Sequence, residues 1–218
     1  MSENALSPDS FREIANVSRE TLDRLRIYAD HLAKWQQALN LVARPTLADL
    51  WRRHMLDSAQ LAAFLPAASA DAPAGRLLDI GSGAGFPGLV LAIVTGRPVE
   101  LVESDSRKCA FLREAVRLTA APAAVLNARI ETLAAAPAAD PAKKTVDILT
   151  ARALAPLEKL CETAVLLGAE TCVFLKGARW QEELTAAEKR WKMRTETFAS
   201  LTAPDGRILR LRDIRRAA

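Results

Sequence analysis

The chain has 218 residues, of which half are apolar and 26% are charged. This composition is typical of one globular domain, with or without an attached arm, and it argues against disorder. The longest apolar runs, such as residues 89–94, are too short to cross a membrane, and the first ten residues lack a secretory-signal pattern. Three widely spaced cysteines and two histidines predict neither a disulfide framework nor a metal site. They suit a reducing compartment, so we expect a cytoplasmic protein.

Basic residues concentrate at the C-terminal end. The whole chain carries 30 basic and 26 acidic side chains, a net charge of +4, but residues 176–218 alone hold 11 basic and six acidic ones. A basic end on an otherwise neutral protein indicates a polyanionic partner. A solubilising tail explains the same charge equally well at this point.

Residues 1–66 are predicted to form an N-terminal helical extension. Apolar side chains recur at three- and four-residue steps from Leu22 to Trp35, which gives one apolar helix face. A second helix is predicted from Leu47 to Phe64, with Thr46 as its N-cap. A linker rich in Ala and Ser, bracketed by prolines 66 and 73, then separates the extension from residues 67–218.

Beyond this linker, strands and helices alternate. Strands are predicted at 77–80, 99–102, 124–126, 146–149 and 171–175. Helices are predicted from the glycine turn after the first strand to about 94, and at about 106–119, 157–167 and 181–191. The proline-containing run 134–142 predicts a loop. Runs 194–201 and 207–211, joined by a turn at 203–206, predict an antiparallel hairpin. The pattern is typical of an α/β fold with a mostly parallel sheet covered on both faces, which we expect to form one compact unit with the extension.

A glycine-rich turn follows the first strand, in the run Asp79-Ile-Gly-Ser-Gly-Ala-Gly-Phe-Pro-Gly88. Turns without Cβ atoms let backbone approach a ligand closely. A dinucleotide fingerprint would place its third glycine at Phe86, so a nicotinamide dehydrogenase is disfavoured. Glu103 lies 22 residues after Gly81, at the end of the second strand, where a carboxylate accepts ribose hydroxyls. The alternative for Glu103 is a charge that stabilises the N-terminus of the next helix. Turn, strand and acid together favour a nucleotide or nucleoside site.

Several runs resemble the RsmG (GidB) family. They are residues 78–89 (LDIGSGAGFPGL), 107–113 (RKCAFLR), 150–156 (TARALAP), 174–177 (FLKG) and 53–58 (RHMLDS), with Trp35 and Asn40-Leu41 before them. The resemblance spans roughly residues 30–180, in order and at fitting spacing. It implies a class I S-adenosylmethionine-dependent methyltransferase, with a Rossmann-like sheet. It also implies methyl transfer to N7 of the guanosine at position 527 of bacterial 16S rRNA, with the rRNA or the 30S subunit as partner.

The turn and the resemblance together give the expected cofactor residues. They are Asp79, Gly81, Gly83, Gly85, Phe86, Glu103, Ile130, Glu131 and Arg152. The resemblance implies that residues 130–131 contact the adenine edge, and that Arg152 lies at the boundary between cofactor and substrate. Relatives often have Asp where this chain has Glu103, which keeps the carboxylate and adds a methylene.

The catalytic candidates are Arg152, His54, Asp57 and Lys176. N7 of guanine has a free lone pair and no proton to remove, so no general base is needed and alignment dominates. A structural role for His54 is as acceptable as a catalytic one, and Lys176 fits either a phosphate contact or a solvated strand end.

The RNA-binding candidates are Arg53, Lys176, Arg207, Arg210 and Arg212. Arg53 also fits a surface pair with Asp57. The basic run at 189–194 surrounds Trp191, which either stacks on a base or lies in the core at a helix end.

Two other functions stay open. The first is methylation of a protein or small molecule by the same fold. The second is a non-catalytic RNA-binding module for ribosome assembly, although the intact turn and Glu103 argue against it. A monomer without a metal is the expected form.

Overall fold

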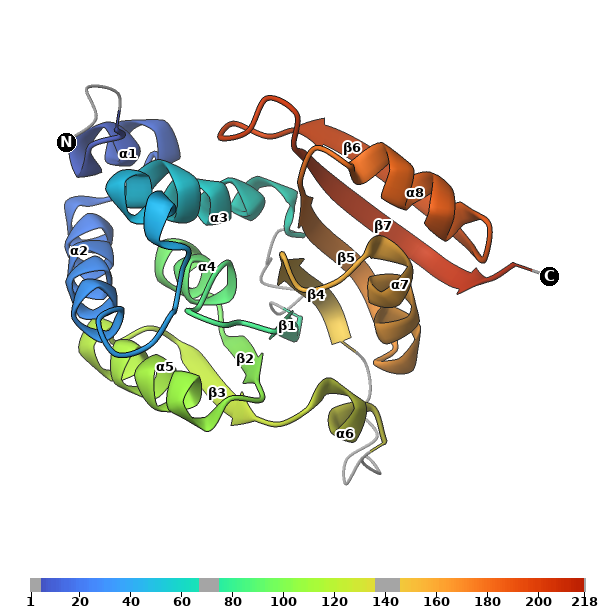
Figure 1. The fold of residues 1–218 in the computed structure, drawn as a ribbon, viewed down its shortest axis with the longest axis horizontal. Coiled ribbons are helices and arrows are strands. Elements are labelled where there is room, and N and C mark those ends of the chain that lie inside the picture. Colours follow the sequence, from blue (N-terminus) through green and yellow to red (C-terminus); the bar gives the residue numbers. More distant parts are fainter. Residues whose placement is uncertain (1–4, 67–74, 136–145, 218) are drawn as a thin grey trace.

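A seven-stranded sheet runs through the centre of the computed structural model, which describes residues 5–66, 75–135 and 146–217 (Figure 1). The strands are β1 (Leu77–Ile80), β2 (Val99–Glu103), β3 (Ala123–Asn127), β4 (Val146–Arg152), β5 (Ala169–Lys176), β6 (Trp191–Ala199) and β7 (Arg207–Arg216). Their order is β3-β2-β1-β4-β5-β7-β6. The first five are parallel, whereas β7 pairs antiparallel with both β5 and β6. The predicted sheet and hairpin are therefore confirmed.

Helices cover both faces of the sheet. One face packs against α4 (Gly88–Thr95) and α5 (Ser106–Thr119), and the other against α6 (Ile130–Ala135), α7 (Leu157–Leu166) and α8 (Trp180–Glu188). All four residues of β1 are buried, because a parallel strand with helices on both sides has no solvent-facing side. The chain adds β2 and β3 on one side of β1 and β4 and β5 on the other. The carboxyl ends of β1 and β4 therefore border the crevice where ligands bind in such sheets.

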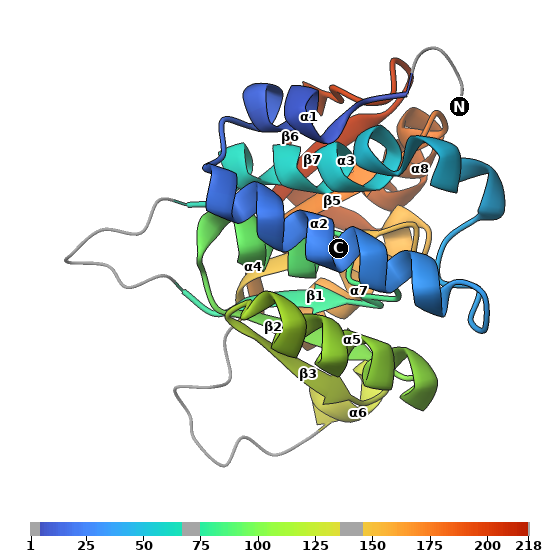
Figure 2. The same cartoon turned by 90° about the vertical axis from the view of Figure 1, so that its left-hand side faces the viewer.

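The N-terminal helices share a core with the sheet domain. They are α1 (Pro8–Ala15), α2 (Arg19–Trp35), the 3₁₀ segment η1 (Arg44–Asp49), the π-helical turn η2 (Trp51–Leu56), α3 (Asp57–Ala59) and the 3₁₀ segment η3 (Gln60–Phe64). Figure 2 shows α1, α2 and α3 layered on the side that faces the viewer, next to α5. Leu25 and Tyr28 of α2 belong to the same buried cluster as Val90 of α4 and Phe111 of α5.

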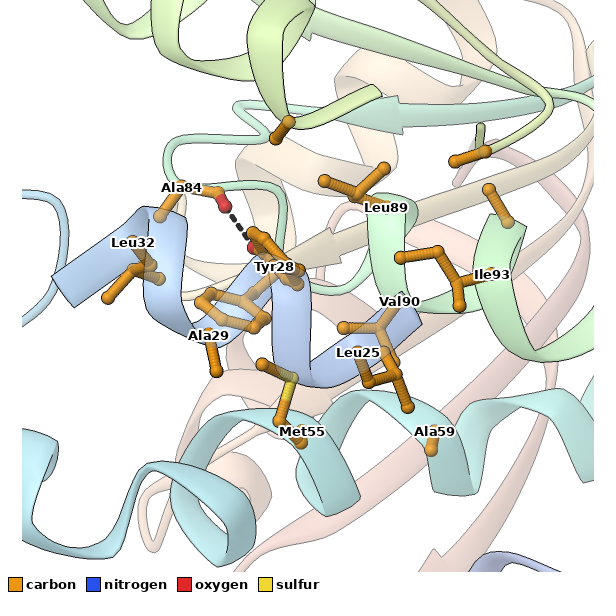
Figure 3. Packing of buried hydrophobic residues seen from close by; sticks show 14 of the residues in the cluster. Leu25, Tyr28, Ala29, Leu32, Met55, Ala59, Ala84, Leu89, Val90 and Ile93 are labelled. Atoms are coloured by element: carbon orange, nitrogen blue, oxygen red, sulfur yellow. Dashed lines mark hydrogen bonds between the residues drawn. The ribbon is translucent and has the colours of Figure 1, made fainter. Parts of the chain in front are cut away.

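Tyr28 links α2 directly to the glycine turn. Its side chain is fully buried, and its hydroxyl donates a hydrogen bond to the carbonyl of Ala84 (Figure 3). Its ring also lies 5.4 Å from that of Phe86. The end of the turn is thus supported from behind by the N-terminal extension.

The second predicted helix is wrong in its form. Residues 44–64 form four consecutive short segments, η1, η2, α3 and η3, rather than one α-helix from Leu47. Thr46 is not an N-cap, because η1 begins at Arg44 and Thr46 lies inside it. Its hydroxyl instead donates to the carbonyl of Ala43, at 2.6 Å. Over segments of one or two turns, apolar side chains three or four positions apart fit 3₁₀, α and π winding alike, so their spacing did not distinguish the three.

The C-terminal boundaries also differ from the prediction. Helix α8 ends at Glu188, and Trp191 opens β6, where burial alternates along the strand. Trp191 is buried as expected, but it lies on a strand rather than at a helix end. Strand β7 extends through the arginine-rich run to Arg216, and α6 was not predicted. Of the predicted loop 134–142, the first two residues belong to α6 and the rest lie outside the described residues, as does most of the predicted linker at 67–74.

Candidate functional site: two adjoining cavities at the carboxyl ends of the strands

The glycine turn has the backbone that its sequence predicts. Gly81, Gly83 and Gly85 adopt positive φ angles of 63°, 56° and 93°, a region that other residues rarely adopt. A Cβ on Gly85 would lie 2.9 Å from the hydroxyl oxygen of Tyr28 and 2.9 Å from Cβ of Leu89. The turn is therefore tightly held on its buried side.

A cavity of about 480 Å³, which we call the glycine-turn cavity, opens in front of this turn. Six of the expected cofactor residues line it: Gly81, Gly83, Glu103, Ile130, Glu131 and Arg152. They come from four separate segments, namely the turn, the end of β2, the start of α6 and the end of β4. The structure thus brings together residues that lie up to 71 positions apart in the sequence.

Glu103 is fixed by two backbone amides. Its Oε2 accepts a hydrogen bond from the amide of Gly83 at 2.9 Å, and its Oε1 accepts one from the amide of Asp105 at 2.8 Å. The side chain is buried, yet it lines the cavity. Each carboxylate oxygen retains a second lone pair for a ligand hydroxyl. Asp105, rather than Glu103, caps the next helix, through the amides of Arg107 and Lys108.

The other three expected cofactor residues, Asp79, Gly85 and Phe86, lie behind the turn and do not line this cavity. Asp79 is fully buried and accepts a hydrogen bond from the Thr150 hydroxyl at 3.0 Å. Burial raises the pKa of Asp79 to about 6. These residues shape and support the turn from its inner side.

A second cavity, of about 840 Å³, adjoins the first, and we call it the arginine cavity. Arg152, Ala153 and Leu154 line both cavities. Ala153 has a φ of +52°, which turns the chain directly after β4. A Cβ built on Gly81 would lie 2.4 Å from Cδ1 of Leu154, so this side chain packs closely on the glycine turn.

Arg152 is held by three acceptors from the π-helical turn and α3. Its Nη1 donates to the carbonyl of Arg53 at 3.0 Å and to Oδ2 of Asp57 at 3.2 Å, and its Nη2 lies 2.7 Å from Nδ1 of His54. The guanidinium carbon also lies 4.9 Å from the centre of the Phe86 ring. These bonds use three of the five N–H groups of the guanidinium. The side chain is therefore oriented, and two N–H groups remain for ligands.

His54 is a neutral hydrogen-bonding residue in this arrangement. Burial and the neighbouring Arg152 lower the pKa of His54 to about 3. Since Arg152 has no acceptor atom, Nδ1 of His54 accepts and Nε2 carries the proton, which faces the Thr46 hydroxyl at 2.7 Å. The Thr46 hydroxyl in turn donates to Ala43, as described above. The imidazole thus has both nitrogens occupied, as expected for a structural histidine.

Lys176 is less available than expected. Its ammonium group lies 2.5 Å from Oε2 of Glu183 and donates to the carbonyl of Ala155 at 3.0 Å. The side chain is 8% exposed, although it borders the arginine cavity. The bond to Ala155 holds the segment that separates the two cavities.

The predicted RNA-binding arginines are not all brought together. Arg53 lines the arginine cavity. Arg207 lies opposite Lys176 of β5 in the sheet, at the first residue of β7. Arg210 forms an ion pair with Glu196 through two hydrogen bonds. Arg212 lies opposite Thr171 in the sheet, toward the other end of β5. Because a strand rises by about 3.3 Å per residue, Arg212 lies roughly 17 Å along β7 from Arg207.

Sequence reasoning did not identify the residues that hold this cluster. Gln60, Thr202 and Tyr28 act through buried or half-buried hydrogen bonds to partners 56 to 145 positions away. The helical spacing of residues 22–35 predicts burial of the Tyr28 ring, but no local spacing reveals the partner of any of these bonds. Thr46 carried a signal, but for a helix cap.

Within the described residues, no group of three or more His, Cys, Asp or Glu side chains is arranged to hold a metal ion. None of the described helices is long and apolar enough to cross a membrane.

Comparison with known proteins points to one family. The family model for GidB, described as rRNA small subunit methyltransferase G, matches residues 21–208. Proteins named ribosomal RNA small subunit methyltransferase G are similar over 97% of this chain. The one from Paramagnetospirillum magneticum is 50% identical, over 98% of its own length, and the one from Rhodospirillum rubrum is 49% identical, over its full length. Among solved structures, a mutant of MtNAS in complex with S-adenosylmethionine matches with a TM-score of 0.54 and 12% identity. That match covers 96% of this chain and 85% of that one, and it supports the fold alone.

Proposed function

Because this chain belongs to the rRNA small subunit methyltransferase G family, we propose that it transfers a methyl group from S-adenosylmethionine to N7 of the guanosine at position 527 of 16S rRNA. One observation of the structure supports this most directly. Two cavities adjoin at the carboxyl ends of β1 and β4 and share Arg152, Ala153 and Leu154. A cofactor in one cavity and a nucleotide in the other would meet at this shared wall.

The glycine-turn cavity suits the cofactor. Gly81 and Gly83 let a ligand approach the backbone, and the free lone pairs of Glu103 face the position of ribose hydroxyls. Ile130 and Glu131 would contact the adenine from the other wall. S-adenosylmethionine supplies an electrophilic methyl group when bound. Asp79, Gly85 and Phe86 would act by holding the turn.

The arginine cavity suits the acceptor guanosine. Its walls include His54, Asp57, Arg152 and Lys176, the four expected catalytic residues. We assign contact with the ligands to Arg152, whose two remaining N–H groups can donate to the guanine or to the cofactor. His54 and Asp57 would position Arg152, and Lys176 would position the 153–156 segment through Ala155.

Methyl transfer to N7 needs no general acid or general base. N7 presents a lone pair, so the step needs alignment of nitrogen, methyl carbon and sulfur, and oriented groups reach effective molarities of about 10⁵–10⁸ M. His54 fits this requirement, since its low pKa keeps the imidazole neutral near pH 7 and both of its ring nitrogens are already hydrogen-bonded within the protein. Fixed dipoles around the cavity can stabilise the charge that develops on the purine.

We further propose that the protein acts as a cytoplasmic monomer, with residues 1–66 as an extension of the 67–218 methyltransferase domain. The core that the N-terminal helices share with the sheet domain supports one compact unit. Partner RNA would meet the molecule at the arginine cavity, which Arg53 lines and next to which Arg207 lies opposite Lys176 in the sheet.

The test is transfer of labelled methyl groups to 30S subunits that lack the modification, with bare 16S rRNA in parallel. Cleavage by borohydride and aniline then locates N7-methylguanosine. We expect label at one guanosine in the 530 loop and none with Gly81→Asp. Gly96→Asp is the matched control, because Gly96 also has a positive φ but a Cβ there would meet no atom within 4 Å.

Three outcomes contradict parts of the proposal. Label at a different base or on a ribosomal protein would overturn the target. Cofactor binding without label on either RNA would favour a protein or small-molecule acceptor. Failure to bind S-adenosylmethionine would favour a non-catalytic RNA-binding module.

A further inference from the structure

Leu201 presents an apolar side chain to solvent at the mouth of the arginine cavity. It lies in the turn between β6 and β7, and its side chain is 65% exposed. Its neighbours Ser200, Thr202 and Ala203 line the cavity, whereas Leu201 does not. It is more exposed than any other large hydrophobic residue of the described chain. A single exposed leucine is ordinary. Leu201 differs because it lies next to the cavity and because hydrogen bonds hold the backbone around it.

The backbone around Leu201 is held in place from both sides. The Leu201 amide donates to Oε1 of Gln60 at 2.8 Å, and the Gln60 side-chain amide reaches Ser200 Oγ at 3.3 Å. The Thr202 hydroxyl donates to Oδ1 of Asp57. Asp57 is the same residue whose other oxygen accepts from Arg152. Leu201 is thus fixed relative to the residue that we place at the cofactor–acceptor boundary.

Three arginines around this mouth suit an RNA backbone. Arg53 and Arg179 line the cavity, and Arg207 begins β7 beside the turn. None of the three forms an ion pair with a described acidic residue, whereas Arg152 and Lys176 are paired with Asp57 and Glu183. Glu182 is the one acidic wall residue outside those two pairs. Arg207 donates to the carbonyls of Pro204 and Gly206, which leaves its positive charge without a counter-ion among the described residues. These three charges favour phosphate contacts near the cavity.

We propose that Leu201 is the wedge that takes the place of the target guanosine in the RNA stack when that nucleotide turns into the arginine cavity. The proposal rests on the function proposed above. A stacked base must leave its stack to enter the arginine cavity, and unstacking has a free-energy cost. Apolar side chains inserted between bases offset this cost in other nucleic-acid-binding proteins. A leucine whose backbone is held in place beside the cavity is placed for that role.

The test compares Leu201→Ser with Leu166→Ser. Leu166 is a matched control because its side chain is 57% exposed and it lies at the end of α7, outside both cavities. We expect Leu201→Ser to lower kcat/KM for the RNA by roughly 10- to 100-fold. Its affinity for S-adenosylmethionine and its Tm should stay unchanged. Leu201→Met should keep most of the activity, since methionine is of similar size and apolar.

Two further readouts separate a wedge from a merely structural residue. Removing the base next to the target guanosine eliminates its stacking partner, so an abasic neighbour should restore the rate of Leu201→Ser. A 2-aminopurine at the target position should become brighter with wild-type protein and much less so with Leu201→Ser, because its emission rises on unstacking.

Equal activity of the two serine variants, or no rescue by the abasic neighbour, would overturn the wedge. If wild-type protein methylates no rRNA, the proposed function fails instead. The two failures are therefore distinguishable.

Discussion

The hydroxyl of Tyr28 tests how strongly the N-terminal extension holds the glycine turn. Tyr28 is fully buried, and its hydroxyl is the partner that the structure gives to the carbonyl of Ala84. In Tyr28→Phe, the ring stays and that carbonyl loses its donor. A buried acceptor without a partner costs about 1–3 kcal/mol. For a chain of this length each kcal/mol lowers Tm by about 2–4 °C, so we expect a decrease of roughly 2–12 °C.

The cofactor provides the second readout. Ala84 lies between Gly83 and Gly85, so a shift of its carbonyl alters the turn that faces the glycine-turn cavity. We expect the Kd for S-adenosylmethionine to rise by up to about tenfold, which corresponds to about 1.4 kcal/mol. Thermal unfolding gives the Tm, and isothermal titration calorimetry gives the Kd.

Thr163→Val is the control for removal of a hydroxyl. The Thr163 hydroxyl donates to the carbonyl of Lys159 at 2.9 Å, but that carbonyl also accepts the helical N–H bond within α7. No acceptor is orphaned, and we expect a loss below about 1 kcal/mol. The reasoning is refuted if Tyr28→Phe leaves both Tm and Kd unchanged, or if the two variants lose equal stability.

Three more predictions follow from the site. Gly81→Ala forces a side chain into a positive φ and against Leu154, so calorimetry should show at least tenfold weaker cofactor binding, and unchanged affinity would contradict this. Asp57→Asn removes the charge that pairs with Arg152, and both side chains are only 17% exposed. Urea unfolding should therefore show that the free energy of unfolding falls by about 1–3 kcal/mol, and a fall below about 0.5 kcal/mol would contradict this. The pKa of His54 is about 3 in the folded protein and about 6.5 in the unfolded chain. Its stabilising effect is therefore present above pH 6.5 and is lost as the pH falls toward 3. Between pH 7 and pH 4, the free energy of unfolding should fall less for His54→Asn than for the wild type. Parallel curves of unfolding free energy against pH would contradict this.

The sheet was predictable because its signals are local. Short apolar runs such as 77–80 and 171–175, each followed by a turn and a longer run that fits a helix, define parallel strands and their helices. The type of helix was predicted poorly where packing against distant segments, rather than local sequence, determines the backbone conformation. Residues 44–64 are apolar at helical spacing, but packing against α1, α4 and the β6–β7 turn selects three kinds of helical winding. Arginines concealed the end of β7, since the predicted run stops at residue 211 whereas the strand continues to Arg216 with no buried residue beyond Leu211.

The site was predicted in part, and for a clear reason. Gly81, Gly83 and Glu103 follow from a turn and a fixed offset along two neighbouring strands. Arg152 follows from the end of a strand that reaches the same edge. By contrast, the hydrogen bonds that orient Arg152 join residues 95 to 99 positions apart, and the Thr202–Asp57 bond spans 145 positions. Such contacts depend on the whole fold, so no spacing rule reveals them.

The position of β7 has a consequence for biosynthesis. This strand is made after β6, yet it lies between β5 and β6. Until it is synthesised, β5 has an open edge and β6 has no partner in the sheet, which is the state most prone to wrong pairing. At about 5–20 residues per second, the ribosome takes roughly one to several seconds to add β6, the turn and β7. A nascent chain ended after Gly206 should therefore be degraded by protease much faster than the full chain, which pulse proteolysis can measure. Resistance equal to that of the full chain would show that the first five strands fold without their last neighbour.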